Sequence, residues 1–266
     1  MLASPFYCIL YLSVSYQYLC IFTPPFSALL LYRIQQWCIP EVDAAFICQM
    51  EDVLDLYEEN WDSEYPIVCL DEKPYQLLDH TRTPLPMKPE KPKREDYTYK
   101  RNGTCNLFIL FSPQAGWRHV KVTKQRTAKD YAECLKDLVD MHFPDAKRIR
   151  IVQDNLNTHK GASLYKRYPA GEARRIYKKV EFHYTPKHAS WLNMAEIEIH
   201  VLGKQCTDRR IGDVETLERE IAAWEEERNH CEAVIHWQFT TEKARDKFEK
   251  AYDNRTKLLS VATFDG

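Results

Sequence analysis

The sequence predicts an α/β fold in which a five-stranded mixed sheet is flanked by helices. Apolar runs with the length and composition of strands occupy residues 67–70, 104–112, 117–123, 149–152 and 180–184. The first three runs follow one another, whereas segments with helical periodicity separate the later ones. An antiparallel meander followed by alternating strands and helices is typical of a mixed sheet with helices packed on it.

The composition is that of a soluble globular chain. Charged residues make up 29% and hydrophobic residues 44% of the 266 positions, enough to bury one large or two modest domains. We divide the chain into an atypical hydrophobic segment (1–35), an amphipathic lead-in helix (36–60), a core domain (61–212) and a helical C-terminal extension (213–266). Nine cysteines without a CxxC pair favour reduced, buried thiols over a disulfide framework or a zinc ribbon.

The first 32 residues carry no charge, and residues 6–23 form an apolar run of borderline transmembrane length. Three readings compete: a membrane anchor, an extra hydrophobic helix packed on the domain, or sequence foreign to the ancestral protein. We favour the third, because Ser13 and Gln17 interrupt the run and the rest of the chain has a soluble composition. We therefore expect no stable membrane association, a cytoplasmic location, and little contribution of this segment to the core fold.

Helical spacing of apolar residues predicts helices over residues 42–60, 127–142, 190–202, 213–229 and 241–252. The first has an acidic outer face, and the second begins with Thr127 as its N-cap and Asp130 three positions later.

Turn and loop signals divide the meander. Asn102-Gly103 predicts a turn, and residues 75–78 the start of a further strand. Residues 83–94, TPLPMKPEKPKR, hold four prolines and predict an extended basic loop. A second basic segment covers residues 160–179. The net charge of −2 does not by itself indicate a polyanionic partner. Basic clusters can follow a phosphate backbone if the fold brings them to one face, but any single cluster is more often a solvated helix face.

Acidic residues stand at the ends of two predicted strands. Asp71 ends the run at 67–70, and Asp154 follows the run at 149–152. A single Asp in this position usually opens a turn. If the first and fourth strands are neighbours, however, both carboxylates lie at one edge, and the helix after the last strand adds Glu196 or Glu198. Converging carboxylates need a cation with a preference for oxygen ligands, Mg²⁺ or Mn²⁺.

Three motifs then resemble one known family. They are LDE at 70–72, VQDNLNTHK at 152–160 and HYTPKHASWLNMAEIE at 183–198. In this order they resemble the catalytic domain of a DDE transposase, in the bacterial insertion-sequence branch of the mariner superfamily. The likeness runs from about residue 36 to 251 and implies an RNase H-like fold for the core domain.

The resemblance implies catalytic and metal-binding roles for Asp71, Asp154 and Glu196, with two Mg²⁺ or Mn²⁺ ions that support DNA cleavage and joining. Glu196 is the third acid because the family places it at the end of a Leu-Asn-x-x-acid turn; Glu198 lies on the opposite side of the helix. Asn155 and Asn193 are supporting residues, and Asn193 is expected to orient Glu196.

The implied partner is double-stranded DNA, as transposon ends and target. The resemblance also implies a nucleoid-associated protein and is compatible with a homodimer. The candidate DNA contacts are Lys91, Lys93, Arg94, Arg118, Lys160 and His188. Family members begin with helix-turn-helix modules, whereas the sequence of the first 32 residues shows no pattern of a recognition helix with a basic face. The alternative is therefore an inactive transposase remnant that binds DNA or interferes with an intact transposase.

Overall fold

The computed structural model of the chain describes residues 42–249, and residues 43–249 belong to one compact unit. The predictions for residues 1–35, and for the end of the last helix after residue 249, lie outside this range. Within it, no helix is long and apolar enough to cross a membrane.

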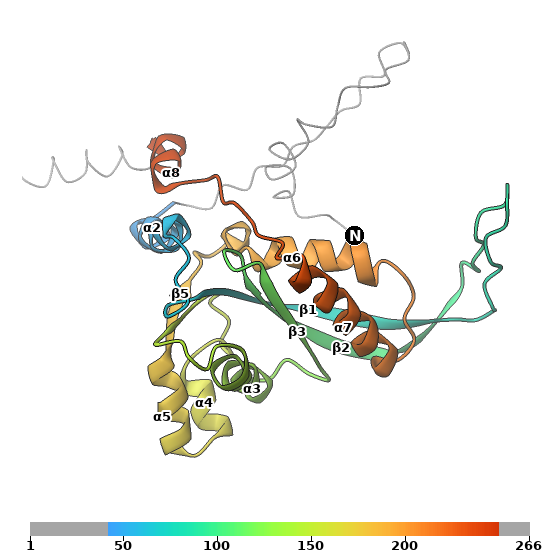
Figure 1. Cartoon of the computed structure of the whole chain (residues 1–266), viewed down its shortest axis with the longest axis horizontal. Helices are drawn as coiled ribbons and strands as arrows, with labels where there is room; N and C mark the ends of the chain where they lie inside the picture. Colours follow the sequence, from blue (N-terminus) through green and yellow to red (C-terminus); the bar gives the residue numbers. More distant parts are fainter. Residues whose placement is uncertain (1–41, 250–266) are drawn as a thin grey trace, which may run out of the picture. The chain divides into compact units, whose positions relative to one another are not determined.

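The predicted five-stranded mixed sheet is confirmed (Figure 1). Its strands lie in the order β3-β2-β1-β4-β5. Their bounds are Ile67–His80 for β1, Tyr99–Ser112 for β2, Trp117–Thr123 for β3, Ile149–Gln153 for β4 and Val180–Tyr184 for β5. The first three pair antiparallel, and β4 runs parallel to both β1 and β5. The expected adjacency of the first and fourth strands is therefore correct.

The helices follow the predicted apolar periodicity. Their bounds are Ala44–Glu58 for α2, Ala128–Asp137 for α3, Ala162–Arg167 for α4, Ala170–Lys179 for α5, Ala195–Leu202 for α6, Val214–His230 for α7 and Thr241–Lys247 for α8. Thr127 caps α3 in a capping box with Asp130, as predicted. Two predicted helices are interrupted: α3 continues as a π-helical turn, Leu138–His142, and a 3₁₀ turn, Ser190–Leu192, precedes α6.

Helices cover both faces of the sheet. On one face, buried side chains of β1 and β2 pack against α3, α4 and α5. This core includes Leu70 and Phe108 from the strands and Tyr131, Leu135, Leu164 and Ile176 from the helices. On the other face, side chains of β2 and β3 pack against α6 and α7. This core includes Leu107, Ile109 and Val120 from the strands and Leu202, Leu217 and Ile221 from the helices. Each face thus has its own apolar core, and the sheet residues that serve them alternate along each strand.

Two predictions in the meander are wrong. Residues 75–78 do not start a new strand, because β1 continues unbroken to His80. Asn102-Gly103 is not a turn; it lies within β2, close to a register shift in β1, and Gly103 adopts φ 112° there. The reason is that β1 and β2 extend together as a two-stranded arm beyond the sheet (Figure 1). The reversal occurs instead in residues 81–98, where isolated bridges join Leu85 to Arg94 and Lys88 to Lys91.

Candidate active site

Asp71 and Glu72 are consecutive residues of β1 that serve opposite faces of the sheet. Asp71 pairs with Ile109, whose side chain belongs to the core under α6 and α7. Glu72 pairs with Phe108, which belongs to the core under α3. Residues directly opposite in an antiparallel pair point to the same face. The Asp71 carboxylate is therefore directed to the α6 side, and the Glu72 carboxylate to the α3 side.

The parallel register of β1 and β4 aligns the two aspartates. Cys69 pairs with Val152, so Asp71 and Asp154 each lie two residues beyond the same rung. Asp71 is still inside β1, not at a strand end as the sequence suggested, whereas Asp154 is the first residue after β4. The carboxyl ends of parallel strands commonly position functional side chains, because the sheet fixes the residue and the following loop leaves room for a ligand.

Glu196 joins these aspartates from the first turn of α6, which packs against β1 and β2. Burial, then repulsion from Glu196 and, more weakly, from Asp154, raises the pKa of Asp71 from 3.8 to about 7. Burial and repulsion from Asp154 likewise raise the pKa of Glu196, against a hydrogen bond from Ser190 and the charge of Lys73. The three carboxyl groups are thus close enough to oppose one another's ionisation.

Asn193 holds the Asp71 carboxylate. Its Nδ2 donates to the Leu70 carbonyl at 2.9 Å and to Asp71 Oδ2 at 3.4 Å, and its Oδ1 accepts from the Ala195 amide at 3.2 Å. Asn193 therefore ties the start of α6 to β1. The Asn193 side chain contacts the Asp71 carboxylate, whereas its contact with Glu196 is through the backbone: the Glu196 amide donates to the Asn193 carbonyl at 3.1 Å. That Asn193 orients the Glu196 carboxylate stays a prediction.

Asn155 supports the site through the backbone. Its Nδ2 donates to the Thr185 carbonyl at 2.9 Å and so links the loop after β4 to the loop after β5. It fixes the segment that carries Asp154 and makes no hydrogen bond to a carboxylate within the described residues.

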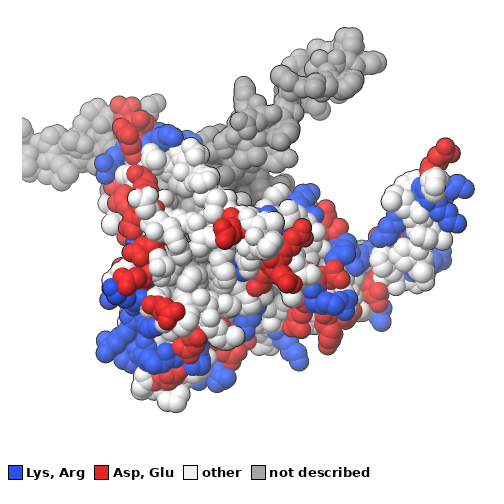
Figure 2. All heavy atoms as spheres, viewed as in Figure 1, with Lys and Arg blue, Asp and Glu red and all other residues white. Residues whose placement is uncertain are grey.

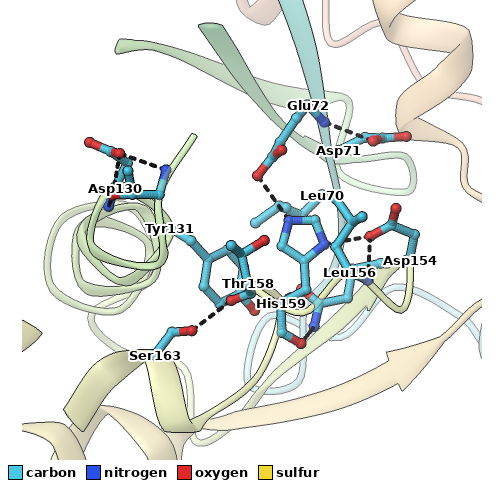
Figure 3. A network of polar contacts seen from close by, with 12 residues as sticks. Leu70, Asp71, Glu72, Asp130, Tyr131, Asp154, Leu156, Thr158, His159 and Ser163 are labelled. Carbon is cyan, nitrogen blue, oxygen red and sulfur yellow. Dashed lines mark hydrogen bonds and ion pairs between the residues drawn. The ribbon is translucent and has the colours of Figure 1, made fainter. Parts of the chain in front are cut away.

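A buried imidazole connects the two faces of the site (Figure 3). His159 Nδ1 lies 2.5 Å from Asp154 Oδ1, and its Nε2 lies 3.0 Å from Glu72 Oε1. The His159 side chain is fully buried, and that of Glu72 is 2% exposed. Burial lowers the pKa of His159, but hydrogen bonds with Asp154 and Glu72 outweigh it and raise this pKa to about 9.

The surroundings of His159 leave it little freedom. Its carbonyl accepts hydrogen bonds from Gln153 Nε2 at 3.1 Å and from the Tyr184 hydroxyl at 3.0 Å. The Tyr131 ring lies 4.8 Å from the imidazole, and its hydroxyl donates to Gln153 Oε1 at 2.7 Å. Neither His159 nor Glu72 was a candidate from the sequence, although both lie inside the motifs at 152–160 and 70–72. Their joint role depends on a contact across 87 positions that no local pattern reveals.

Glu198 belongs to a separate buried network, as its helical phase predicted. Its Oε1 lies 2.9 Å from Arg118 Nε and 3.1 Å from Arg228 Nε. The guanidinium of Arg118 also donates to the carbonyls of Arg228 and Ala233. The proposal that Arg118 contacts DNA is therefore wrong. In the alternating strand β3 this side chain points inward to the core under α6 and α7, and it is completely buried.

The other candidate DNA contacts are exposed. We call Lys91, Lys93 and Arg94 the arm cations; they lie near the tip of the β1–β2 arm, where Lys93 pairs with Glu95 at 2.5 Å. Lys160 and His188 are exposed in the loops after β4 and β5. Lys and Arg side chains gather on the arm and over α5 in Figure 2.

Part of the second basic segment is neutralised by the fold. Arg167 pairs with Glu133 at 2.7 Å, and Arg175 pairs with Glu172 and with Asp140 at 2.8 Å each. The charge count from the sequence therefore overstates the cations that this segment can offer to a polyanion.

Asp71, Asp154 and Glu196, the carboxylate trio, offer the donor atoms that a hard divalent cation prefers. Carboxylate oxygens are the ligands that Mg²⁺ and Mn²⁺ prefer, and a cation would relieve the repulsion that raises the pKa of Asp71. Within residues 42–249, however, no three His, Cys, Asp or Glu side chains form a ready ligand set. The carboxylates are electrostatic neighbours, not a preassembled metal site, and their convergence on a shared ion stays a prediction.

Comparison with known proteins agrees with this geometry. Residues 66–218 match the family model of the DDE superfamily endonucleases. A Mos1 transposase paired-end complex with the left transposon end is similar in structure, with a TM-score of 0.51, 13% identity, and coverage of 91% of this chain and 69% of that one. The mariner Mos1 paired-end complex with Mg has a TM-score of 0.50 and 16% identity, with coverage of 91% and 70%.

No curated protein sequence matches the chain. The fold is nevertheless the RNase H-like fold of the Mos1 transposase catalytic domain. Because the family model covers more than half of its residues, the chain belongs to the DDE superfamily of endonucleases.

Proposed function

We propose that this chain is a metal-dependent DNA transposase that cleaves and joins phosphodiester bonds with Asp71, Asp154 and Glu196. The observation that carries the proposal is the β1–β4 register, which places both aspartates two residues beyond the Cys69–Val152 rung. The raised pKa values of Asp71 and Glu196 support it: burial is the main cause of both, and repulsion from Glu196 and Asp154 adds to the pKa of Asp71, and from Asp154 to that of Glu196, at the edge to which α6 brings the third acid.

The chain's own residues bind and orient. Asn193 fixes Asp71, and the loop held by Asn155 presents Asp154, which is 38% exposed on its side chain. Asp71, Asp154 and Glu196 would hold Mg²⁺ or Mn²⁺, as two ions in this proposal, and the bound metal would supply activation of the attacking oxygen and stabilisation of the leaving oxygen. The Mos1 paired-end complex with Mg supports this choice of metal.

The DNA contacts proposed are electrostatic. The arm cations, Lys160 and His188 are exposed and would contact phosphates. Because Mos1 is seen in paired-end complexes, we further propose that the chain acts on transposon ends as a dimer. Light scattering of the protein with and without duplex DNA tests that stoichiometry.

A nicking assay on supercoiled DNA tests the function. Wild type with Mg²⁺ or Mn²⁺ should nick, and chelator, Asp154→Asn or Glu196→Gln should abolish nicking. Asp208→Asn, which changes an exposed aspartate after α6, is the matched control and should nick as wild type does. A folded wild type that binds DNA but never nicks would favour the inactive remnant, and full activity of Asp154→Asn would refute the site.

A further inference from the structure

Glu72 and His159 are buried and ionisable, and neither belongs to the carboxylate trio. They come from different elements, β1 and the loop after β4, and meet at 3.0 Å between Glu72 Oε1 and His159 Nε2. The imidazole then reaches Asp154 on its other side at 2.5 Å. The three side chains form a continuous chain of contacts that ends on a proposed metal ligand (Figure 3).

The two oxygens of Asp154 have different environments. Oδ1 contacts His159 Nδ1 and also accepts from the Leu156 amide at 3.2 Å. Oδ2 has no hydrogen-bond partner within residues 42–249. The protein therefore holds one oxygen from the α3 side and leaves the other available, which is how a ligating carboxylate is oriented by its surroundings.

This arrangement is a costly way to fill a core. Ionisable groups are expensive to bury unless every polar atom is satisfied, yet Glu72 Oε2 has no partner in the described part of the chain. An apolar pair of similar volume is often as stable as a buried ion pair or more so. A gain in stability therefore does not explain why Glu72 and His159 occupy these buried positions, whereas their contact with Asp154 does.

We propose that Glu72 and His159 are positioning residues that fix the Asp154 carboxylate for metal binding, an inference that rests on the proposed function. His159 holds Asp154, and Glu72 holds His159. Neither residue is proposed to ligate an ion or to contact DNA.

Mn²⁺ binding, followed by electron paramagnetic resonance without DNA, tests the inference alongside thermal unfolding. The variants are Glu72→Leu, Glu72→Gln and His159→Phe, with Asp154→Asn as the ligand control and Glu133→Leu as a matched α3 control. Loss of a hydrogen-bonding partner behind a ligand typically weakens metal affinity by about 10- to 100-fold. We expect that loss for Glu72→Leu, for His159→Phe and for the variant that combines them. Only the combined variant leaves neither buried group without its partner, so it should unfold at a midpoint equal to or above that of wild type.

Three comparisons separate positioning from packing. Glu72→Gln keeps an oxygen for His159 and should bind Mn²⁺ better than Glu72→Leu. The double variant Glu72→Leu with His159→Phe should bind no worse than His159→Phe, because the two residues act in series. If a single variant does not fold, the double variant decides the question, because it leaves no buried charge without a partner.

The outcomes are distinguishable. If Asp154→Asn loses Mn²⁺ affinity while Glu72→Leu and His159→Phe keep it, the inference is overturned and the proposed function stands. If Asp154→Asn binds Mn²⁺ as wild type does, the metal site itself is misassigned and both fail.

Discussion

Two glutamates on one turn of α6 should respond in opposite ways to the same substitution. Glu196→Gln removes a carboxylate that its neighbours oppose, whereas Glu198→Gln removes one that buried arginines require. We predict that the first variant loses metal-dependent nicking without loss of stability. The second should lose stability but keep nicking when it is assayed below its unfolding transition.

The magnitude follows from burial. The side chains of Glu198 and Arg118 are both completely buried and 2.9 Å apart, and Arg228, 22% exposed, also pairs with Glu198. Breaking a buried pair typically costs about 3–5 kcal/mol. We take about 3 kcal/mol, because Gln keeps an acceptor oxygen of the same shape. For a domain of this size that loss lowers the unfolding midpoint by roughly 6–12 °C.

Glu196→Gln should have the opposite effect on stability. Burial and repulsion from Asp154 raise the pKa of Glu196, which means that its charged form is unfavourable in the metal-free fold. A neutral Gln should therefore leave the midpoint unchanged or slightly higher. Circular dichroism melts in chelator, paired with nicking at a temperature where all variants are folded, measure both quantities.

Two results would refute this reasoning. The first is that the folded Glu198→Gln variant cannot nick DNA while the Glu196→Gln variant can. The second is that the Glu198→Gln variant is as stable as wild type. As a further check, combining Arg118→Met with Glu198→Leu should recover part of the lost stability, because an apolar pair replaces the unpaired charge. Recovery is partial, since Arg118 also donates to two carbonyls.

Three further predictions follow. The pKa of Asp71 is raised from 3.8 to about 7, so between these pH values the folded, metal-free protein holds a proton that the unfolded chain has lost. Its stability should therefore fall as the pH rises through this range. Asp71→Asn should flatten that decline in thermal melts with chelator. Replacing the three arm cations with Ala should lower the slope of log affinity for random duplex against log salt by up to about 2.7, at about 0.9 per charge, and an unchanged slope would exclude the arm from DNA contact. Gly116→Ala should cost more than about 1 kcal/mol in chemical denaturation, because its φ is 63° and a Cβ would lie 2.5 Å from backbone after α7; Gly171→Ala, which meets nothing within 4 Å, is the control.

The sheet was predictable because strand periodicity is a local signal. The runs at 117–123 and 180–184 are strands with those bounds, and the Thr127 cap was readable from four residues. The arm was not, because Asn102-Gly103 has the composition of a hairpin turn. Only the pairing of β1 with β2 across that point decides that the dipeptide continues a strand.

The site was predictable to the extent that each residue has its own signal. Asp71, Asp154 and Glu196 stood out by their positions in motifs, whereas Arg118 was misread because a basic residue in an alternating strand gives no sign of which face is buried. Its inward direction depends on α6 and α7 packing on that face. His159 and Glu72 were missed for the same reason, since their significance is a contact between distant segments.

The buried network of Glu198 also bears on the chemistry of Glu196. Successive residues of an α-helix are about 100° apart, so positions 196 and 198 project in nearly opposite directions from α6. Because Arg118 and Arg228 hold Glu198 in the core, α6 cannot rotate about its axis without burying an unpaired charge. Asn193 fixes the start of the same helix to β1. Asn193, on the side of Asp71, and the Glu198 network, on the other side of the helix, therefore both fix α6, so Glu196 should keep its direction when Glu198 alone is replaced by Gln.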